Sequence, residues 1–127
     1  MNIKLRDGLP FIEVDLVHDG KTLNLKNVLV DTGSASTIIS TDIALGLGLG
    51  PSPDDELIRI HGVGGSEYVY EKSIEEIRLE TTTISNLKVD VGAMDYGFEI
   101  DAIIGMNFLI SAKLIIDIDK MNIYPAN

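Results

Sequence analysis

One segment of the sequence carries residue types that could do acid–base chemistry. The apolar run Val28–Val30 leads directly into Asp31, Thr32, Gly33 and Ser34. Placing a carboxylate at the end of an apolar strand is costly unless nearby donors satisfy it. Gly33 lets the chain fold tightly around the acid, so the backbone N–H groups of residues 33 and 34 and the hydroxyls of residues 32 and 34 are the nearest donors. The segment therefore predicts a carboxyl group held in a fixed pose.

A single carboxyl group cannot both accept a proton from water and donate one to a leaving group. Two carboxyls in contact can divide these roles, because like charges so close together cannot both ionise. The chain contains one Asp-Thr-Gly, no Asp-Ser-Gly and no internal repeat. A second acid would therefore come from another copy across a twofold axis, which predicts a homodimer. Asp-Thr-Gly is also a good turn sequence, but the apolar strand before it disfavours that alternative.

Composition narrows the classes of function. The 127 residues fit one domain, residues 1–127, with 45% hydrophobic and 24% charged residues. A net charge of −10 argues against nucleic acid and anionic membranes as partners. The chain has no Cys and two His, which excludes disulfides and makes a thiolate or His-rich metal site unexpected. We expect no metal, no cofactor and, without a signal pattern or an apolar run of membrane-spanning length, a cytoplasmic location.

Short alternating segments separated by Gly and Pro indicate an all-β fold, closed or sandwiched, with one or two short helices. Asp19-Gly20 predicts a hairpin, Ser40 or Thr41 could cap a helix through about Leu45, and Asn107–Ala112 could form a second. The expected strands are Asn2–Arg6, Phe11–Val17, Thr22–Leu25, Val28–Val30, Thr37–Ser40, Leu57–His61, Glu67–Tyr70, Ile74–Leu79, Leu87–Val91, Ala102–Ile104, Lys113–Ile118 and Asn122–Tyr124. The Gly-rich residues Gly62–Gly65 would be the flexible tip joining two of them.

Three motifs together resemble the retropepsin-like aspartic peptidases. Val30–Ala35 is similar to the active-site motif of that family, and Ala102–Leu109 resembles its second signature, in which apolar residues and a Gly precede a short helix. Gly62–Gly65 lies where the family carries its flap. The order and approximate spacing of the three motifs match over most of Leu16–Ile118.

This resemblance implies a closed retropepsin-like β-barrel, half the size of a pepsin, that is active as a homodimer. Asp31 would be the catalytic acid. The residues implied to support it are Thr32, which would interlock with its counterpart in the other copy, Gly33 and Ser34. The loop behind the site would be formed by Ile103, Ile104 and Gly105, and the flap over the substrate by Gly62, Val63, Gly64 and Gly65.

The function that follows is an aspartic endopeptidase whose paired Asp31 carboxyls activate a water molecule, with no metal or covalent intermediate. An extended polypeptide would bind through main-chain hydrogen bonds, as in strand addition, with apolar side-chain pockets from residues such as Ile60, Val63, Ile100 and Ile103. One alternative is a non-catalytic peptide-binding or dimerisation module with the same fold. Another is a small β scaffold in which Asp31 is only a turn residue.

Overall fold

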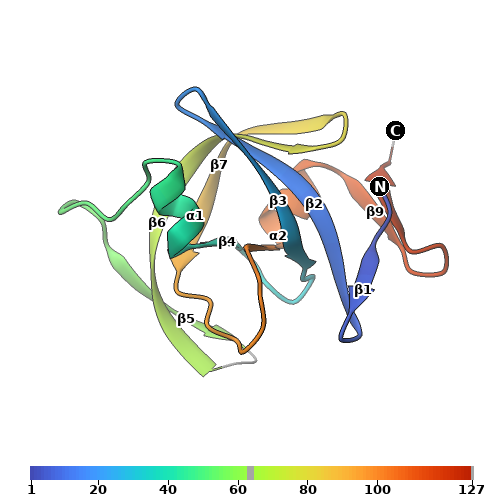
Figure 1. Cartoon of the computed structure of the whole chain (residues 1–127), viewed down its shortest axis with the longest axis horizontal. Coiled ribbons are helices and arrows are strands. Elements are labelled where there is room, and N and C mark those ends of the chain that lie inside the picture. The colour runs from blue at the N-terminus through green and yellow to red at the C-terminus, as the bar shows by residue number, and fades with distance from the viewer. Residues whose placement is uncertain (63–64, 127) are drawn as a thin grey trace.

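The fold of this chain is built almost entirely from β-strands. A computed structural model of the protein describes residues 1–62 and 65–126, and these form ten strands and two short helices (Figure 1). In chain order they are β1 (Lys4–Arg6), β2 (Leu9–His18), β3 (Lys21–Val30), β4 (Thr37–Ser40), α1 (Thr41–Gly46), β5 (Leu57–Gly62), β6 (Gly65–Leu79), β7 (Thr82–Gly92), β8 (Ala102–Ile104), α2 (Met106–Ser111), β9 (Leu114–Asp117) and β10 (Asn122–Pro125).

Two tight turns set the register of the first three strands. Asp19 and Gly20, with φ angles of 49° and 75°, join β2 to β3. Asp-Gly favours such a turn because both central residues adopt positive φ. Asp7 and Gly8, with φ angles of 54° and 77°, join β1 to β2 in the same way. The first hairpin confirms its sequence signal, whereas the second carries the same Asp-Gly signal and was not predicted.

Eight strands form one strongly bent sheet in the order β1-β2-β3-β8-β4-β7-β6-β5. An additional pairing of β2 with β6 folds the sheet back on itself, as a barrel requires. The expected all-β class is therefore confirmed. Among the described residues the barrel is not formally closed, because β1 and β5 stand at the two ends of the strand order.

Several strands are longer than their sequence patterns predicted, and two of them join segments that were expected to be separate. β3 and β6 each run without a break through segments expected to contain two strands. In β6 the polar pair Lys72-Ser73 interrupts the alternation, yet it keeps its register with Val89 and Lys88 on β7. Backbone pairing thus continues across residues whose side chains give no strand signal.

The interior contains two clusters of apolar side chains. The larger one fills the barrel between the folded halves of the sheet and includes Leu16, Ile74, Ile77 and Phe108, all fully buried. The smaller one consists of Phe11, Ile38, Met94, Ile100 and Ile103. No helix in the described residues is long and apolar enough to cross a membrane.

Both short helices lie within one residue of where the sequence indicated. Ser40 caps α1, because its hydroxyl accepts a hydrogen bond of 3.2 Å from the backbone N–H of Ile43. α2 follows Gly105 directly and ends at Ser111, so that its buried residues Phe108 and Leu109 face the core. This second helix begins one residue before the predicted range.

The two ends of the chain lie side by side (Figure 1). β9 and β10 form an antiparallel hairpin that is separate from the large sheet. Asn2 bridges to Asn122, with backbone hydrogen bonds of 2.8 Å from Ile3 to Met121 and 2.9 Å from Ile123 to Met1. The N-terminal residues therefore extend the β9–β10 hairpin from the β10 side.

Candidate active site

Asp31 follows the last residue of β3, next to the centre of the large sheet. β3 pairs in parallel with β8, so that Val30 stands opposite Ile104. The backbone N–H of Asp31 donates a 3.0 Å hydrogen bond to the carbonyl of Ile104. The acid therefore emerges from a backbone position that a neighbouring strand holds fixed.

The carboxylate has one of the donors expected from the sequence. The Gly33 N–H donates a 2.9 Å hydrogen bond to Oδ1 of Asp31. The Ser34 N–H instead donates to the main-chain carbonyl of Asp31 at 3.2 Å, and the Ser34 hydroxyl donates to the Ser36 carbonyl at 2.7 Å. The expectation that the Ser34 hydroxyl holds the carboxyl is therefore wrong, because the turn directs that hydroxyl along the loop. Asp31 itself is half-buried and Thr32 is exposed.

The loop behind Asp31 is locked by the start of α2. The N–H of Met106 donates to the Ser34 carbonyl at 2.7 Å, and the N–H of Asn107 donates to the Ala35 carbonyl at 3.2 Å. Gly105 lies so close to this loop that a Cβ atom there would stand 2.0 Å from the Ser36 carbonyl oxygen. Only glycine fits at this position without moving the backbone.

Two further residues belong to the site although the sequence did not single them out. Thr37 is fully buried, and its hydroxyl donates a 2.7 Å hydrogen bond to Oδ1 of Asn107. The same hydroxyl accepts a 3.2 Å hydrogen bond from the Gly105 N–H. Asn107 also accepts from the N–H of Phe108 at 2.9 Å and donates to the carbonyl of Lys88 at 3.0 Å. This polar pair, seventy positions apart in the sequence, joins the start of β4, which follows the Asp31 loop, to α2.

The smaller apolar cluster of the interior lies next to the strand that carries the acid. In the smaller core cluster, Ile103 on β8 contacts side chains that come from β2, β4 and the segment between β7 and β8. Leu29, two residues before Asp31, is the register partner of Ile103 and packs against this cluster. Of the four positions expected to form apolar pockets, Ile60, Ile100 and Ile103 meet in this cluster. The fourth, Val63, lies outside the described residues.

The β5–β6 hairpin is the segment expected to form the flap. Its strands pair up to Gly62 opposite Gly65, while Val63 and Gly64 lie outside the described residues. Thus Gly62 and Gly65 end their strands where the flap tip was expected, and the role of all four residues stays a prediction.

The loop before this hairpin is tied to β6 by an ion pair. Asp55 Oδ2 lies 3.0 Å from Nζ of Lys72 and accepts a 2.7 Å hydrogen bond from the N–H of Ser52. The Ser52 amide, followed by Lys72, lowers the pKa of Asp55 below its ordinary value of 3.8. Tyr70 adds a second tie through a 3.1 Å hydrogen bond to the Leu49 carbonyl, and burial raises the pKa of its phenol.

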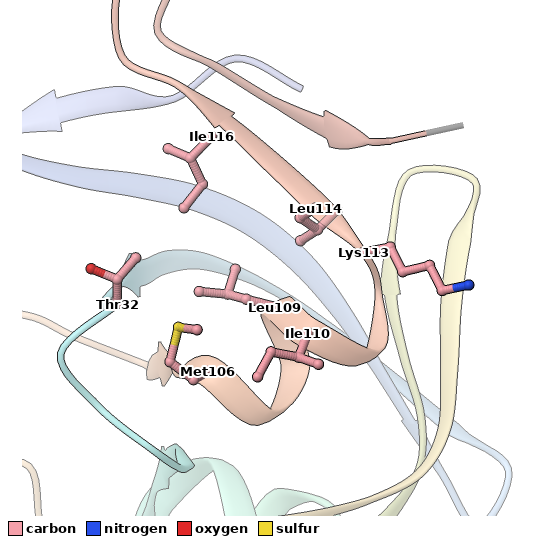
Figure 2. Close-up of a pocket in the computed structure, with 7 residues that line it drawn as sticks. All are labelled: Thr32, Met106, Leu109, Ile110, Lys113, Leu114 and Ile116. Carbon is pink, nitrogen blue, oxygen red and sulfur yellow. The ribbon is translucent and has the colours of Figure 1, made fainter.

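A shallow apolar groove of about 340 Å³ opens on the side of the Asp31 loop that carries Thr32 (Figure 2). Its wall is formed by α2 and β9, with Met106, Leu109, Ile110, Leu114 and Ile116, and Lys113 marks its far end. The groove thus connects the residue after the acid with the terminal hairpin.

The candidate site thus consists of a half-buried Asp31 on a loop that is held by Gly105 and the start of α2. A family model described as aspartyl protease matches residues 14–108, which is most of the chain. The chain therefore belongs to the aspartyl protease family and is an aspartic-type endopeptidase, a hydrolase of peptide bonds.

Solved structures share the retropepsin-like fold. A retropepsin-like aspartic protease from Rickettsia conorii has a TM-score of 0.66 and 20% identity, with 91% of this chain and 82% of that chain covered. The EIAV protease, solved with the inhibitor HBY-793, has a TM-score of 0.59 and 21% identity, with 83% of this chain and 88% of that chain covered. A search of curated proteins found no match. The resemblance stated from the sequence motifs is thereby confirmed.

Proposed function

We propose that the chain is active as a homodimer in which one water molecule is activated between two Asp31 carboxyls. The observation that carries this proposal is that the described structure fixes one carboxylate of the motif by main-chain contacts and leaves it half-exposed next to an apolar groove. One such acid is half of a general acid–base pair. A second copy supplies the other half by symmetry.

In this mechanism the two Asp31 side chains hold one proton between them. The ionised carboxyl removes a proton from water as the water attacks the substrate carbonyl, and the protonated carboxyl polarises that carbonyl. The Gly33 N–H keeps Oδ1 of each Asp31 in place, at 2.9 Å in this structure. Ser34 contributes to the turn that orients the acid, and Thr32 faces the other copy.

The substrate would lie extended between the flap and the side of the smaller apolar cluster that carries the partly buried Ile60. Ile60, Ile100 and Ile103 supply apolar contacts for alternate side chains of a strand-like polypeptide. The hairpin tip, Gly62 to Gly65, would close over the peptide and exclude water. The loop of Ile103, Ile104 and Gly105 supports the acid from behind.

The proposal also includes the domain, location, cofactor and partner expected from the sequence. We propose a single domain over residues 1–127 that works in the cytoplasm, needs no cofactor, and has a second copy and a polypeptide as its partners. Its net charge of −10 opposes contact with nucleic acid or anionic lipid.

The test is cleavage of a diverse peptide library by the wild-type chain and by Asp31→Asn. We expect the variant to fold and to bind peptides while the cleavage rate falls by about 10²–10⁴-fold or more. Retained cleavage in Asp31→Asn would refute the catalytic role of this acid. A wild-type chain that binds peptides and cleaves none would favour the non-catalytic module.

A mixing experiment tests the shared site. When equal amounts of wild type and Asp31→Asn exchange subunits, about one quarter of the dimers keep two acids. Activity should therefore fall to about one quarter of that of the same total chain as wild type. A fall to about one half would instead mean that each subunit works alone.

A further inference from the structure

Asp90 on β7 is a buried acid without a partner in the described part of the chain. Thr37 and Asp90 are the two buried polar residues among those described, and Asp90 is 8% exposed. Thr37 has two hydrogen bonds, whereas the Asp90 side chain has no hydrogen bond or ion pair with any described residue. A buried carboxylate is costly unless donors or a cation satisfy it. Asp90 is therefore a candidate for binding a group from outside the chain.

The carboxylate oxygens of Asp90 remain accessible although most of the residue is covered. Every fully buried side-chain oxygen or nitrogen atom in the described residues has a hydrogen-bond partner. Because the Asp90 oxygens have no such partner, they must keep contact with solvent. An incoming group can therefore reach the carboxylate without a rearrangement of the core.

The strand register places Asp90 on the face of the sheet that carries the smaller apolar cluster. Val89 and Val91 beside it on β7 belong to the larger cluster, so the Asp90 side chain points to the opposite face. Asp90 stands opposite Ile38 on β4, and Ile38 stands opposite Ile103 on β8. Both isoleucines belong to the smaller cluster, so Asp90 ends their row.

The other end of this row leads to the candidate active site. Ile103 stands opposite Leu29 on β3, and Asp31 lies two residues after Leu29, so alternation places it on the same face. Neighbouring strands lie about 4.8 Å apart, so the three steps from β3 through β8 and β4 to β7 span about 14 Å. An extended peptide advances about 3.3 Å per residue, so a side chain within about four residues of the cleaved bond can reach Asp90.

The charged groups around Asp90 leave its carboxylate open to a cation. Glu71 on β6 is its register partner and adds a second carboxylate to the same face. Lys88 lies two residues before Asp90 on β7, but its Nζ lies 3.7 Å from the Glu71 carboxylate and its side chain is 74% exposed. The described residues contain no group of three acidic or His side chains that could hold a metal ion. An ammonium or guanidinium group is therefore the cation that this acid fits best.

We propose that Asp90 is a specificity-determining residue that binds a lysine or arginine side chain of the polypeptide substrate. The charged end of that side chain would contact the Asp90 carboxylate, and its apolar stem would lie along Ile38. This inference rests on the proposed peptidase mechanism and adds a substrate preference to it. The net charge of −10 also favours the approach of a basic peptide over that of an acidic one.

The experiment compares two peptides that differ at one position. One carries lysine there and the other norleucine, which has a similar apolar stem without the ammonium group. The position is varied over four residues on each side of the cleaved bond. We expect wild type to cleave the lysine peptide with a kcat/KM at least about 10-fold higher at one position, as a charge-assisted hydrogen bond to a buried carboxylate allows. The difference should lie mainly in KM, because Asp90 binds the substrate away from the reacting atoms.

Three variants test whether Asp90 causes the preference. Asp90→Asn removes the charge with little change of shape and should bring the ratio of the two kcat/KM values to within about threefold of one. Asp90→Glu keeps the charge and should keep a preference for lysine. Asp19→Asn is the matched control, because it removes the same charge in the exposed β2–β3 turn, at the end of β3 remote from Asp31, and should leave the ratio unchanged.

Two results would overturn the assignment. One is a lysine preference that survives in Asp90→Asn. The other is a wild-type chain that cleaves the lysine and norleucine peptides equally at every position, a comparison that needs no variant to fold. The second result would leave the peptidase mechanism standing.

Peptide binding separates this inference from the proposed function. Binding of the same two peptides is measured with Asp31→Asn, and with Asp31→Asn combined with Asp90→Asn. A lysine preference in binding that is lost in the double variant would support the subsite. If the wild-type chain also cleaves no peptide, that result would refute the proposed mechanism while the subsite stands.

Discussion

The hydrogen bonds of Thr37 permit a quantitative test of what holds the Asp31 loop in place. Thr37→Val keeps the shape of the side chain and removes the hydroxyl, so that the buried Gly105 N–H loses its 3.2 Å acceptor. Asn107 loses a 2.7 Å donor but still accepts from Phe108. An unsatisfied buried donor costs about 1–3 kcal/mol and a lost hydrogen bond about 1 kcal/mol. We therefore expect a loss of about 2–4 kcal/mol in the free energy of unfolding.

The measurement is urea unfolding followed by circular dichroism at one fixed protein concentration, because association would shift the apparent stability. Thr37→Ser is the matched variant, since it keeps the hydroxyl and removes one methyl, at a cost of about 1 kcal/mol. The exposed Thr22 provides a baseline, and Thr22→Val should change stability by no more than about 0.5 kcal/mol.

The relative stability of the two Thr37 variants shows whether hydrogen bonding or side-chain shape matters more at this position. If the hydrogen bonds matter most, the valine variant is the less stable and cleaves peptides more slowly, because the Asp31 loop loses its support. If the shape of the Thr37 side chain matters more than its hydrogen bonds, Thr37→Ser is the less stable variant, because it lacks the methyl group. A valine variant as stable as Thr22→Val would refute the reasoning.

Three shorter predictions follow from other contacts. Gly105→Ala should prevent stable folding or lower the unfolding free energy by more than about 3 kcal/mol in urea titration, because its Cβ would stand 2.0 Å from the Ser36 carbonyl oxygen; native stability would contradict this. Asp55→Asn should lower the free energy of unfolding in urea at pH 7. Since the folded pKa of Asp55 is depressed, the difference in unfolding free energy between wild type and variant should shrink as pH falls below 3.8. A difference that is constant with pH would count against the ion pair with Lys72. Peptide cleavage should increase from neutral to mildly acidic pH, because one shared proton relieves the repulsion between two Asp31 carboxylates; a rate that climbs above pH 8 would contradict a shared proton.

The parts of the site that the sequence predicted are those encoded in short continuous stretches. Asp31 with Gly33, and Ile104 with Gly105, each form a local motif whose apolar strand and glycine are visible without a structure. Gly33 does donate to the acid as its position suggested. The register of β2 and β3 from Val14 to the turn was likewise predictable, because Asp19-Gly20 fixes it locally, whereas the register shift between Ile12 and Val14 was not.

The parts that escaped prediction depend on contacts between distant segments. Thr37 looks like an ordinary strand residue and Asn107 like an ordinary helix residue until β4 and α2 meet. The sequence also does not reveal that Ser34 bonds to Ser36 and not to the acid, because the direction of a hydroxyl depends on the turn geometry. Likewise, the in-chain pairing of Asn2 with Asn122 joins the two ends of the sequence, which no local pattern indicates.

The contacts around Asp31 fix the position of one carboxyl group, whereas the proposed chemistry needs two. The pose of the acid is set by main-chain groups: the Ile104 carbonyl, the Gly33 N–H, and the α2 amides that bind the carbonyls of residues 34 and 35. These main-chain contacts do not require a particular side chain in the loop, although the Ser34 hydroxyl adds one hydrogen bond there, whereas position 105 has no room for a Cβ atom. None of them adds a second carboxyl. We infer that a subunit fixes the pose of its acid by itself. In the proposed dimer, the second copy would supply the neighbouring carboxyl with which this acid shares one proton.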